Sequence, residues 1–372
     1  MKTIHHPLVP TGPGASLELV SLHYGTPGSG PKAALQASLH ADEIPAMLVA
    51  HRLRRRLDAL DAQGSVRGEI VLVPAANPIG LGQRLLHGPQ GRFDLASGEN
   101  FNRHYANLVD AVAQRVQGRV GADAAHNVRV VRDALREAAA ALPARSTLES
   151  LRKVLLRLAI DADVVLDLHS DQEGVLHLYT TPASWPRVEP LARTLGVRVA
   201  LLAETSGDDP FDEACSMVWP LLAQRLGPAV PLPAAGVAAT VELRGESDVS
   251  NELAQHDAQA ILHYLATQGF IDEPQPELPP ALCEATPLSG SMSVVAPFGG
   301  IVVYLREPGD AVRAGDPIAQ LIDPIADRLQ VLKSPVDGVF YARELRRFTP
   351  AGGSICKIAG REPRRQGKLL SD

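Results

Sequence analysis

The sequence predicts an α/β protein with a mixed, mostly parallel sheet flanked by helices, plus a small all-β domain at the C-terminus. Short apolar segments typical of strands alternate with longer helical patterns as far as residue 268, which is typical of parallel sheets. A Pro-rich stretch, 273–280, then interrupts this alternation. Beyond it the chain lacks helical patterns and repeats itself. We therefore expect an α/β domain over 1–272, a linker over 273–284, a β domain over 285–362 and a tail over 363–372.

The first half of the chain supplies the first candidate site residues. Ser16–Leu22 alternates in polarity as a strand does, and Lys32–Leu39 is predicted to be a buried strand. That strand ends in His40 and Glu43, and a helix is expected from about Ala46 to Leu60. A strand followed by His-x-x-Glu and a helix can deliver two metal ligands to the carboxyl end of a sheet.

A further strand over Gly68–Ala76 is stopped by Asn77-Pro78, and a long loop then runs to Tyr105. This loop is polar, Gly-rich and contains several arginines. Loops of this length in compact domains are usually functional or disordered, and the Glu99–Arg103 segment favours function. The next stretch, 106–160, predicts two or three helices with a break near Pro143; it forms either a lid or an oligomer contact.

Two later strands place further polar groups at their ends. Ala162–Leu168 is a strand that ends in His169, and Gly236–Glu246 is a strand that presents Glu242 near its end. Shorter strands are expected over 174–179 and 197–202, with a closing helix over 252–268. In open α/β sheets, the carboxyl ends of the strands are where ligands bind.

The C-terminal segment contains an internal repeat. Residues 296–302 (APFGGIV) are similar to residues 334–340 (SPVDGVF), and 315–318 (GDPI) are similar to 352–355 (GGSI). Two similar β halves of this kind predict a small pseudo-twofold sandwich.

Composition excludes several classes of protein. The 372 residues are 45% hydrophobic with a net charge of −6, which favours a soluble protein without a nucleic-acid or anionic-membrane partner. Apolar runs are too short to span a bilayer, and the first residues lack the apolar core of a signal peptide. The three cysteines are scattered and form neither metal-binding spacing nor a disulfide framework. We therefore expect a cytoplasmic protein.

The four polar residues at strand ends suggest a specific chemistry. Two imidazoles and one carboxylate, here His40, His169 and Glu43, are a ligand set of catalytic zinc, with the fourth position left to water. Glu242 suits the role of a carboxylate that takes the proton from that water. Each residue also has a structural alternative: His169 as a core histidine, Glu242 as the partner of an arginine. Asp42 is expected to cap the following helix.

Four motifs resemble the zinc carboxypeptidase-like fold, and most closely its succinylglutamate desuccinylase/aspartoacylase family. They are His40-x-x-Glu43, Asp167-Leu168-His169-Ser170, Asn102-Arg103 and Thr240-Val241-Glu242-Leu243-Arg244, in the family's order over about residues 15–270. The resemblance implies one Zn²⁺ per subunit on His40, Glu43 and His169, with Glu242 as general base.

The resemblance also implies substrate contacts. The family's Asn-Arg pair, which holds the substrate carboxylate, corresponds to Asn102 and Arg103; guanidinium forks match carboxylates. An arginine that polarises the scissile carbonyl corresponds to Arg92, with Arg84 as the competing candidate. Arg84 competes with Arg92 for this role because residues 95–99 are inserted relative to the family's spacing. In addition, Asn100-Phe101 stands where the family has Asp-Leu.

The C-terminal domain resembles biotinyl/lipoyl-like barrel-sandwich domains, on the Pro308–Ile318 run. Carrier domains hold a modified lysine at the hairpin tip between their halves, whereas the tip here, 323–328, contains no lysine. Lys333 stands beside the next Ser-Pro instead. We therefore expect no biotin or lipoyl attachment, and a domain that caps the active site or builds an oligomer.

Together these features predict a zinc-dependent amidohydrolase that deacylates an N-acyl amino acid or related N-acyl amine carrying a carboxylate. The deacetylases of N-acetyl-diaminobutyrate in ectoine breakdown are similar in outline. The alternatives are a metallocarboxypeptidase acting on short peptides, which shares the catalytic residues, and a non-catalytic zinc-binding protein. A homo-oligomer is expected.

Overall fold

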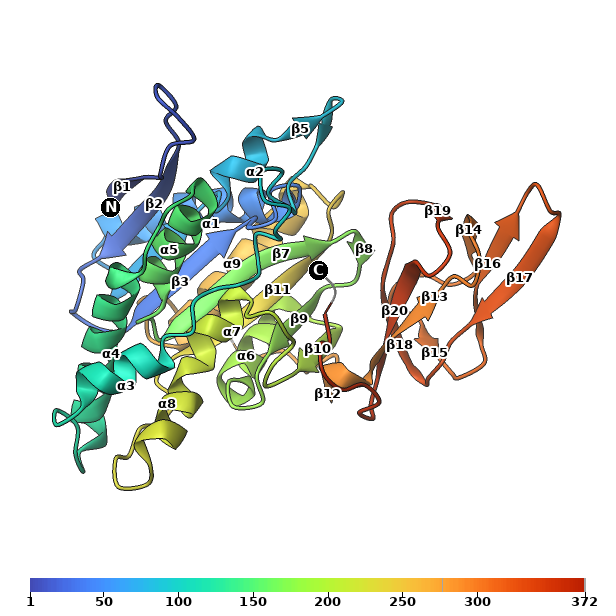
Figure 1. The fold of residues 1–372 in the computed structure, drawn as a ribbon. Helices are drawn as coiled ribbons and strands as arrows, with labels where there is room; N and C mark the ends of the chain where they lie inside the picture. Colours follow the sequence, from blue (N-terminus) through green and yellow to red (C-terminus); the bar gives the residue numbers. More distant parts are fainter. Residues whose placement is uncertain (276, 371–372) are drawn as a thin grey trace.

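The computed structural model describes residues 1–275 and 277–370. Residue 276 of the predicted linker and residues 371–372 of the predicted tail lie outside the described residues. The chain folds into a large mixed sheet with helices on both faces, followed by two antiparallel sheets at the C-terminal end (Figure 1). This architecture confirms the predicted fold class.

The large sheet has the order β1-β2-β4-β3-β7-β11-β9-β10-β12 in the described part of the chain. Its strands are β1 (Lys2–Pro7), β2 (Glu18–Gly25), β3 (Lys32–Ala37), β4 (Glu69–Val73), β7 (Val164–Asp171), β9 (His177–Thr180), β10 (Val199–Leu202), β11 (Val237–Gly245) and β12 (Ala285–Pro287). Neighbours β4, β3, β7 and β11 are parallel. Parallel neighbours end at the same edge, so the chain segments that follow β3 and β7 come together beside the end of β11.

Helices cover both faces of this sheet because successive side chains of a strand point to opposite faces. One face packs on α1 (Pro45–Ala62), α6 (Trp185–Leu195) and α9 (Asn251–Thr267). The other packs on α3 (Val109–Val116), α4 (Ala124–Ala141), α5 (Thr147–Ala159), α7 (Phe211–Ser216) and α8 (Val218–Leu226). Ala33 and Leu35 of β3 join the first apolar cluster, whereas Ala34 between them joins the second. Within the described residues, every helix is too short or too polar to cross a membrane.

Three regions of the chain refine the sequence predictions. The N-terminal residues form β1, which pairs antiparallel with β2 and was not predicted as a strand. The stretch 106–160 forms α3, α4 and α5, and Pro143 lies between α4 and α5 as expected. The long loop before Tyr105 contains a short helix α2 (Pro78–Gly82) and a two-strand hairpin, β5 (Arg84–Leu85) and β6 (Gly88–Pro89).

The C-terminal region is a sandwich of two antiparallel sheets. One contains β13 (Ser291–Val295), β20 (Ser354–Gly360), β18 (Gly338–Arg343) and β15 (Ala311–Val312); the other contains β17 (Arg328–Lys333), β16 (Pro317–Asp323), β14 (Gly300–Tyr304) and β19 (Phe348–Thr349). One apolar cluster, which includes Phe340 and Leu321, joins the two sheets. Gly338 is required because a Cβ there would lie 2.2 Å from the Ala359 carbonyl oxygen.

A short strand links the sandwich to the large sheet. β8 (Glu173–Gly174), which directly follows β7, pairs antiparallel with β18 of the sandwich. A shared apolar cluster that includes Tyr179, Leu201, Leu288 and Tyr341 packs beside this pairing. The C-terminal sandwich is therefore anchored next to the end of the central strand β7 (Figure 1).

Candidate active site

The candidate residues meet at the carboxyl ends of three adjacent parallel strands. The loop after β3 carries His40 and Glu43, and β7 carries His169. On β11, Glu242 is the register partner of His169. Since the side-chain direction alternates along a strand, Asp167 and His169 share one face of the sheet.

The loop that carries His40 and Glu43 is fixed by several hydrogen bonds. Ser38 adopts a left-handed conformation, with φ of 58°, and its hydroxyl donates to the Glu43 carbonyl oxygen at 2.6 Å. The Asn77 amide donates to the Leu39 carbonyl oxygen at 2.9 Å. The Ala41 amide donates to the carbonyl oxygen of Gly91 at 3.0 Å. A strained backbone held by this many partners is typical of a site whose geometry matters.

Asp42 does not cap α1, contrary to the sequence prediction. The N-cap residue of α1 is Ile44, which makes no side-chain capping bond, and Pro45 opens the helix. Proline at this position has no N–H, so one of the donors that a capping side chain would satisfy is already missing.

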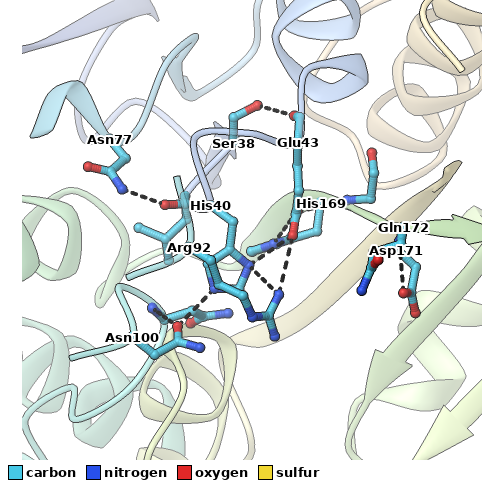
Figure 2. Close-up of polar contacts among 12 residues, drawn as sticks. Ser38, His40, Glu43, Asn77, Arg92, Asn100, His169, Asp171 and Gln172 are labelled. Atoms are coloured by element: carbon cyan, nitrogen blue, oxygen red, sulfur yellow. Dashed lines mark hydrogen bonds and ion pairs between the residues drawn. The ribbon is translucent and has the colours of Figure 1, made fainter. Parts of the chain in front are cut away.

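Glu43 lies between the two imidazoles. Its Oε1 lies 2.9 Å from His40 Nδ1, and its Oε2 lies 2.8 Å from His169 Nδ1 (Figure 2). Oε2 also accepts a hydrogen bond from the Ser170 backbone amide at 2.9 Å. The three side chains are buried, and their potential ligand atoms all lie within 4.8 Å of one another. This is a compact group of two nitrogen ligands and one carboxylate.

The outer nitrogen of each imidazole faces an acceptor. His40 Nε2 lies 2.8 Å from Asn100 Oδ1, and His169 Nε2 lies 2.9 Å from Asp167 Oδ2. These acceptors favour a proton on Nε2, which leaves the Nδ1 lone pair for a metal ion. The sequence analysis assigned no role to Asp167 or Asn100. A charged residue inside an otherwise apolar strand, two positions before His169, was the available signal for Asp167.

The electrostatics of the group suit a bound cation. Burial, with Arg92 next, lowers the pKa of His40 and so favours the neutral ring that binds metals. Burial opposes a charged Glu43, but His169 and His40 hold its pKa below the ordinary value. Burial likewise opposes a charged His169, but Asp167 and Glu43 raise its pKa well above the ordinary value. Asp167 and Glu43 therefore stabilise positive charge at His169, whereas His40 is held toward the neutral form that can bind a metal ion.

Glu242, on β11, adds a second carboxyl group to this part of the sheet. Within the described residues, its Oε2 is buried and has no hydrogen-bond partner. Burial, followed by the charge of Glu43, raises the pKa of Glu242 to about 8. Its neighbour Arg244 forms a two-armed ion pair with Asp257 at 2.8 Å instead. A perturbed carboxyl group beside a potential metal site is typical of a catalytic acid or base.

Of the two candidate arginines, the structure brings only Arg92 to the group. Arg92 Nη1 lies 3.3 Å from His40 Nδ1 and 3.6 Å from Glu43 Oε1, and its side chain is 40% exposed (Figure 2). Arg84 is exposed on β5, where its guanidinium donates to the Leu81 and Gln83 carbonyl oxygens. The hairpin that follows α2 thus carries Arg84 to the surface.

Asn102 and Arg103 are both buried next to Asn100. Asn102 Oδ1 accepts a hydrogen bond from the Phe211 backbone amide at 2.9 Å, at the start of α7. Arg103 Nη1 donates to the Asn102 carbonyl oxygen at 2.7 Å. Asn102 therefore helps to hold the loop to α7, a structural role that the sequence analysis did not predict.

Comparison with known proteins gives the family. The Succinylglutamate desuccinylase/Aspartoacylase catalytic domain profile matches residues 29–267. The chain belongs to this family, whose members are amide-hydrolysing enzymes. The match spans every residue of the His40, Glu43, His169 and Glu242 group.

Solved structures support the assignment over nearly the whole chain. A family protein from Shewanella amazonensis has 27% identity and a TM-score of 0.84, with 96% of this chain and 98% of that chain covered. One from Shewanella frigidimarina has 24% identity and a TM-score of 0.85, with coverages of 96% and 97%. The ectoine utilization protein EutE (DoeB) of Ruegeria pomeroyi, bound to product, has 14% identity and a TM-score of 0.69, with coverages of 96% and 95%. The two likenesses under 25% identity show a shared fold alone. No curated protein sequence matches the chain.

Gly91 packs tightly against the loop that carries His40 and Glu43, and a substitution there tests whether this loop must be rigid to bind metal. A Cβ on Gly91 would lie 2.1 Å from the Asp42 backbone nitrogen, so Gly91→Ala must displace the loop between His40 and Glu43. We expect the affinity for Zn²⁺, measured by chelator competition, to fall by about tenfold or more. Gly121→Ala is the control, because no atom lies within 4 Å of its added Cβ. Equal affinities in the two variants would contradict the rigid-loop interpretation.

Proposed function

We propose that the chain is a zinc-dependent amidohydrolase that removes the acyl group from an N-acyl amino acid or a related N-acyl amine. The observation that carries the proposal is the buried His40–Glu43–His169 group beside the unpartnered carboxyl of Glu242. Membership in a family of desuccinylases and aspartoacylases supports the reaction class.

The donor set fits zinc. Two imidazole Nδ1 atoms and one carboxylate are a common ligand set of catalytic zinc, and Asn100 and Asp167 orient the rings from outside. Zn²⁺ bound to His40, Glu43 and His169 would polarise the acyl carbonyl and acidify a water molecule. One ion per subunit is proposed.

Glu242 supplies the proton transfers in this proposal. A dication held by His40, Glu43 and His169 would offset the negative charge of Glu43, lower the pKa of Glu242 and leave it a carboxylate. This carboxylate accepts the proton of the attacking water and then passes it to the amine that leaves when the C–N bond breaks. Arg92, beside His40 and Glu43, donates to the acyl oxygen as negative charge develops there. We propose Arg92 for this role and not Arg84, which lies on the exposed hairpin.

Asn102 and Arg103 are proposed to select substrates with a free carboxylate. A guanidinium fork can donate two parallel hydrogen bonds to a carboxylate, and both residues lie in the segment that holds His40 through Asn100. The resemblance to the deacetylases of ectoine breakdown suggests N-acetyl-diaminobutyrate as one candidate substrate, and the fold shared with an ectoine utilization protein agrees with it.

We further propose a homo-oligomer in the cytoplasm. The outer face of the β14, β16, β17 and β19 sheet carries a row of apolar side chains that are register neighbours, of which Phe348, Ile301 and Leu329 are exposed and Ile322 is partly buried. Exposed apolar faces of this kind favour protein contacts. All three cysteines are free, which agrees with a reducing compartment.

Primary-amine release by the zinc-loaded protein tests the proposed function. The substrates are N-acetyl, N-formyl and N-succinyl amino acids, with short peptides alongside. Release from an acyl series would support a deacylase. Release from peptides alone would assign a carboxypeptidase instead, and zinc binding without any turnover would favour a non-catalytic zinc protein.

Glu242→Gln tests the general base. We expect kcat to fall by about 10²- to 10⁴-fold, because the amide cannot accept the proton of the attacking water. Zinc content, measured by elemental analysis, is expected to stay at the wild-type level because Glu242 is not a ligand in this proposal. Glu252→Gln, on the exposed first turn of α9, serves as the control. An unchanged kcat in the Glu242 variant would remove it from the mechanism.

Arg92→Met and Arg84→Met form a matched pair of arginine variants. The Arg92 variant should lose about 10²- to 10³-fold in kcat, the usual effect of removing one donor to a developing oxyanion. The Arg84 variant should keep the wild-type kcat, since its guanidinium contacts only nearby backbone carbonyls. Steady-state kinetics on one acyl substrate decides between them, and a reversed order would reassign the role.

A further inference from the structure

The C-terminal sandwich clamps the chain segment that directly follows β7. Besides the β8–β18 pairing, Arg347 and Arg343 both form ion pairs with Glu173. Gln172 donates to Glu344 Oε2 at 2.5 Å, and the Val175 amide donates to the Tyr341 carbonyl oxygen at 2.9 Å. Residues of the sandwich thus hold the segment that begins at Gln172, three positions after His169.

One contact of this clamp reaches the strand itself. Lys357, on β20 of the sandwich, places its Nζ 2.8 Å from Asp171 Oδ2 at the end of β7. The Lys357 side chain is 33% exposed and that of Asp171 is 15% exposed, so the pair is only partly shielded from solvent. Because strand side chains alternate, Asp171 lies on the same face of β7 as His169 and Asp167.

Lys357 is the charge that balances Asp171. The other basic side chain near this carboxylate is His177, whose Nε2 lies 3.9 Å from Asp171 Oδ2. Burial lowers the pKa of His177 to about 4, so this ring is neutral near pH 7. Among the described residues, the remaining ion pairs between the sandwich and the segment after β7 are those of Glu173 with Arg343 and Arg347.

The position of this pair gives it electrostatic reach into the candidate active site. Lys357 and Asp171 act with opposite signs on Glu242, which is the register partner of His169. Without the ammonium, Asp171 would add an uncompensated negative charge beside a group that already holds Glu43, Asp167 and Glu242. Hydrolysis of an amide develops further negative charge on the acyl oxygen, so such a charge would oppose the transition state.

We propose that Lys357, delivered by the C-terminal sandwich, is a positioning residue of the active site: it neutralises Asp171 and thereby keeps unbalanced negative charge away from the metal-binding group and Glu242. The sandwich is then an electrostatic part of the catalytic centre. The prediction for turnover rests on the proposed hydrolase reaction, whereas the prediction for metal binding rests only on the proposed Zn²⁺ site.

Metal affinity tests the inference without substrate. Zn²⁺ dissociation constants, from chelator competition, are compared for wild type, Lys357→Met, Lys357→Arg and the double variant Asp171→Asn/Lys357→Met. We expect Lys357→Met to bind Zn²⁺ about threefold more tightly or better, because an unpaired anion attracts the dication. The arginine variant and the double variant should both match the wild type, since each restores the charge balance.

Arg347→Met is the matched control. It removes the ion pair with Glu173, between the sandwich and the segment after β7, and leaves the Lys357–Asp171 pair intact. The Zn²⁺ affinity should therefore not change. A purely structural role of Lys357 predicts the opposite sign, weaker Zn²⁺ binding with a lower Tm, in Lys357→Met. That result, or an affinity equal to the wild type, would overturn the inference; if Lys357→Met fails to fold, weaker binding by the double variant would do so.

Turnover supplies the second readout on the substrate that the wild type cleaves. Lys357→Met should lower kcat by about tenfold with little change in KM, and Asp171→Asn/Lys357→Met should regain most of the loss. A double variant no faster than Lys357→Met would contradict charge balancing. A wild type that cleaves no acyl substrate would contradict the proposed function, while the Zn²⁺ affinities would still decide the role of Lys357.

Discussion

The carboxylate of Glu43 between two imidazoles is the contact on which the site depends. It joins the loop after β3 to the end of β7, through His40 on one side and His169 and the Ser170 amide on the other. Three buried polar groups in an apolar sheet are tolerated only because each has a partner. The surrounding elements supply those partners: Asn100 from the long loop and Asp167 from β7 itself.

The same requirement explains the long segment between β4 and Tyr105. Asn77, Gly91, Arg92 and Asn100 all lie on it, and each contacts the ligand loop or one of its residues. A loop of this length would be costly in conformational entropy if it served only as a connection. Here it supplies the groups that contact His40 and its loop, and the hydrogen bond between Asn102 and the Phe211 amide of α7 holds the segment in place.

The C-terminal sandwich contacts the chain directly after β7. Its pairing with β8 and the ion pairs to Glu173 fix the end of β7 from outside the catalytic domain. A carrier-like β domain without a lysine at its hairpin tip therefore serves in this chain to hold the end of β7. Phe348, Ile301 and Leu329 on its outer sheet are exposed in the single chain, and they form the surface proposed above for contact with a second copy.

Sequence by itself determined the α/β class, the family and the strand ends that carry His40, Glu43, His169 and Glu242, because strand periodicity and short motifs are local properties. It also revealed the β repeat: Gly300 and Gly338, which are equivalent positions of the two halves, are the first residues of β14 and β18. Tertiary structure alone placed Arg92, and not Arg84, beside His40 and Glu43, gave Asn100 and Asp167 their places behind the rings, left Asp42 without a capping role and brought Lys357 to Asp171. These outcomes depend on which distant segments pack together, and contacts over 60 or more residues, such as His40–Asn100 and Asp171–Lys357, leave no periodic signal in the chain.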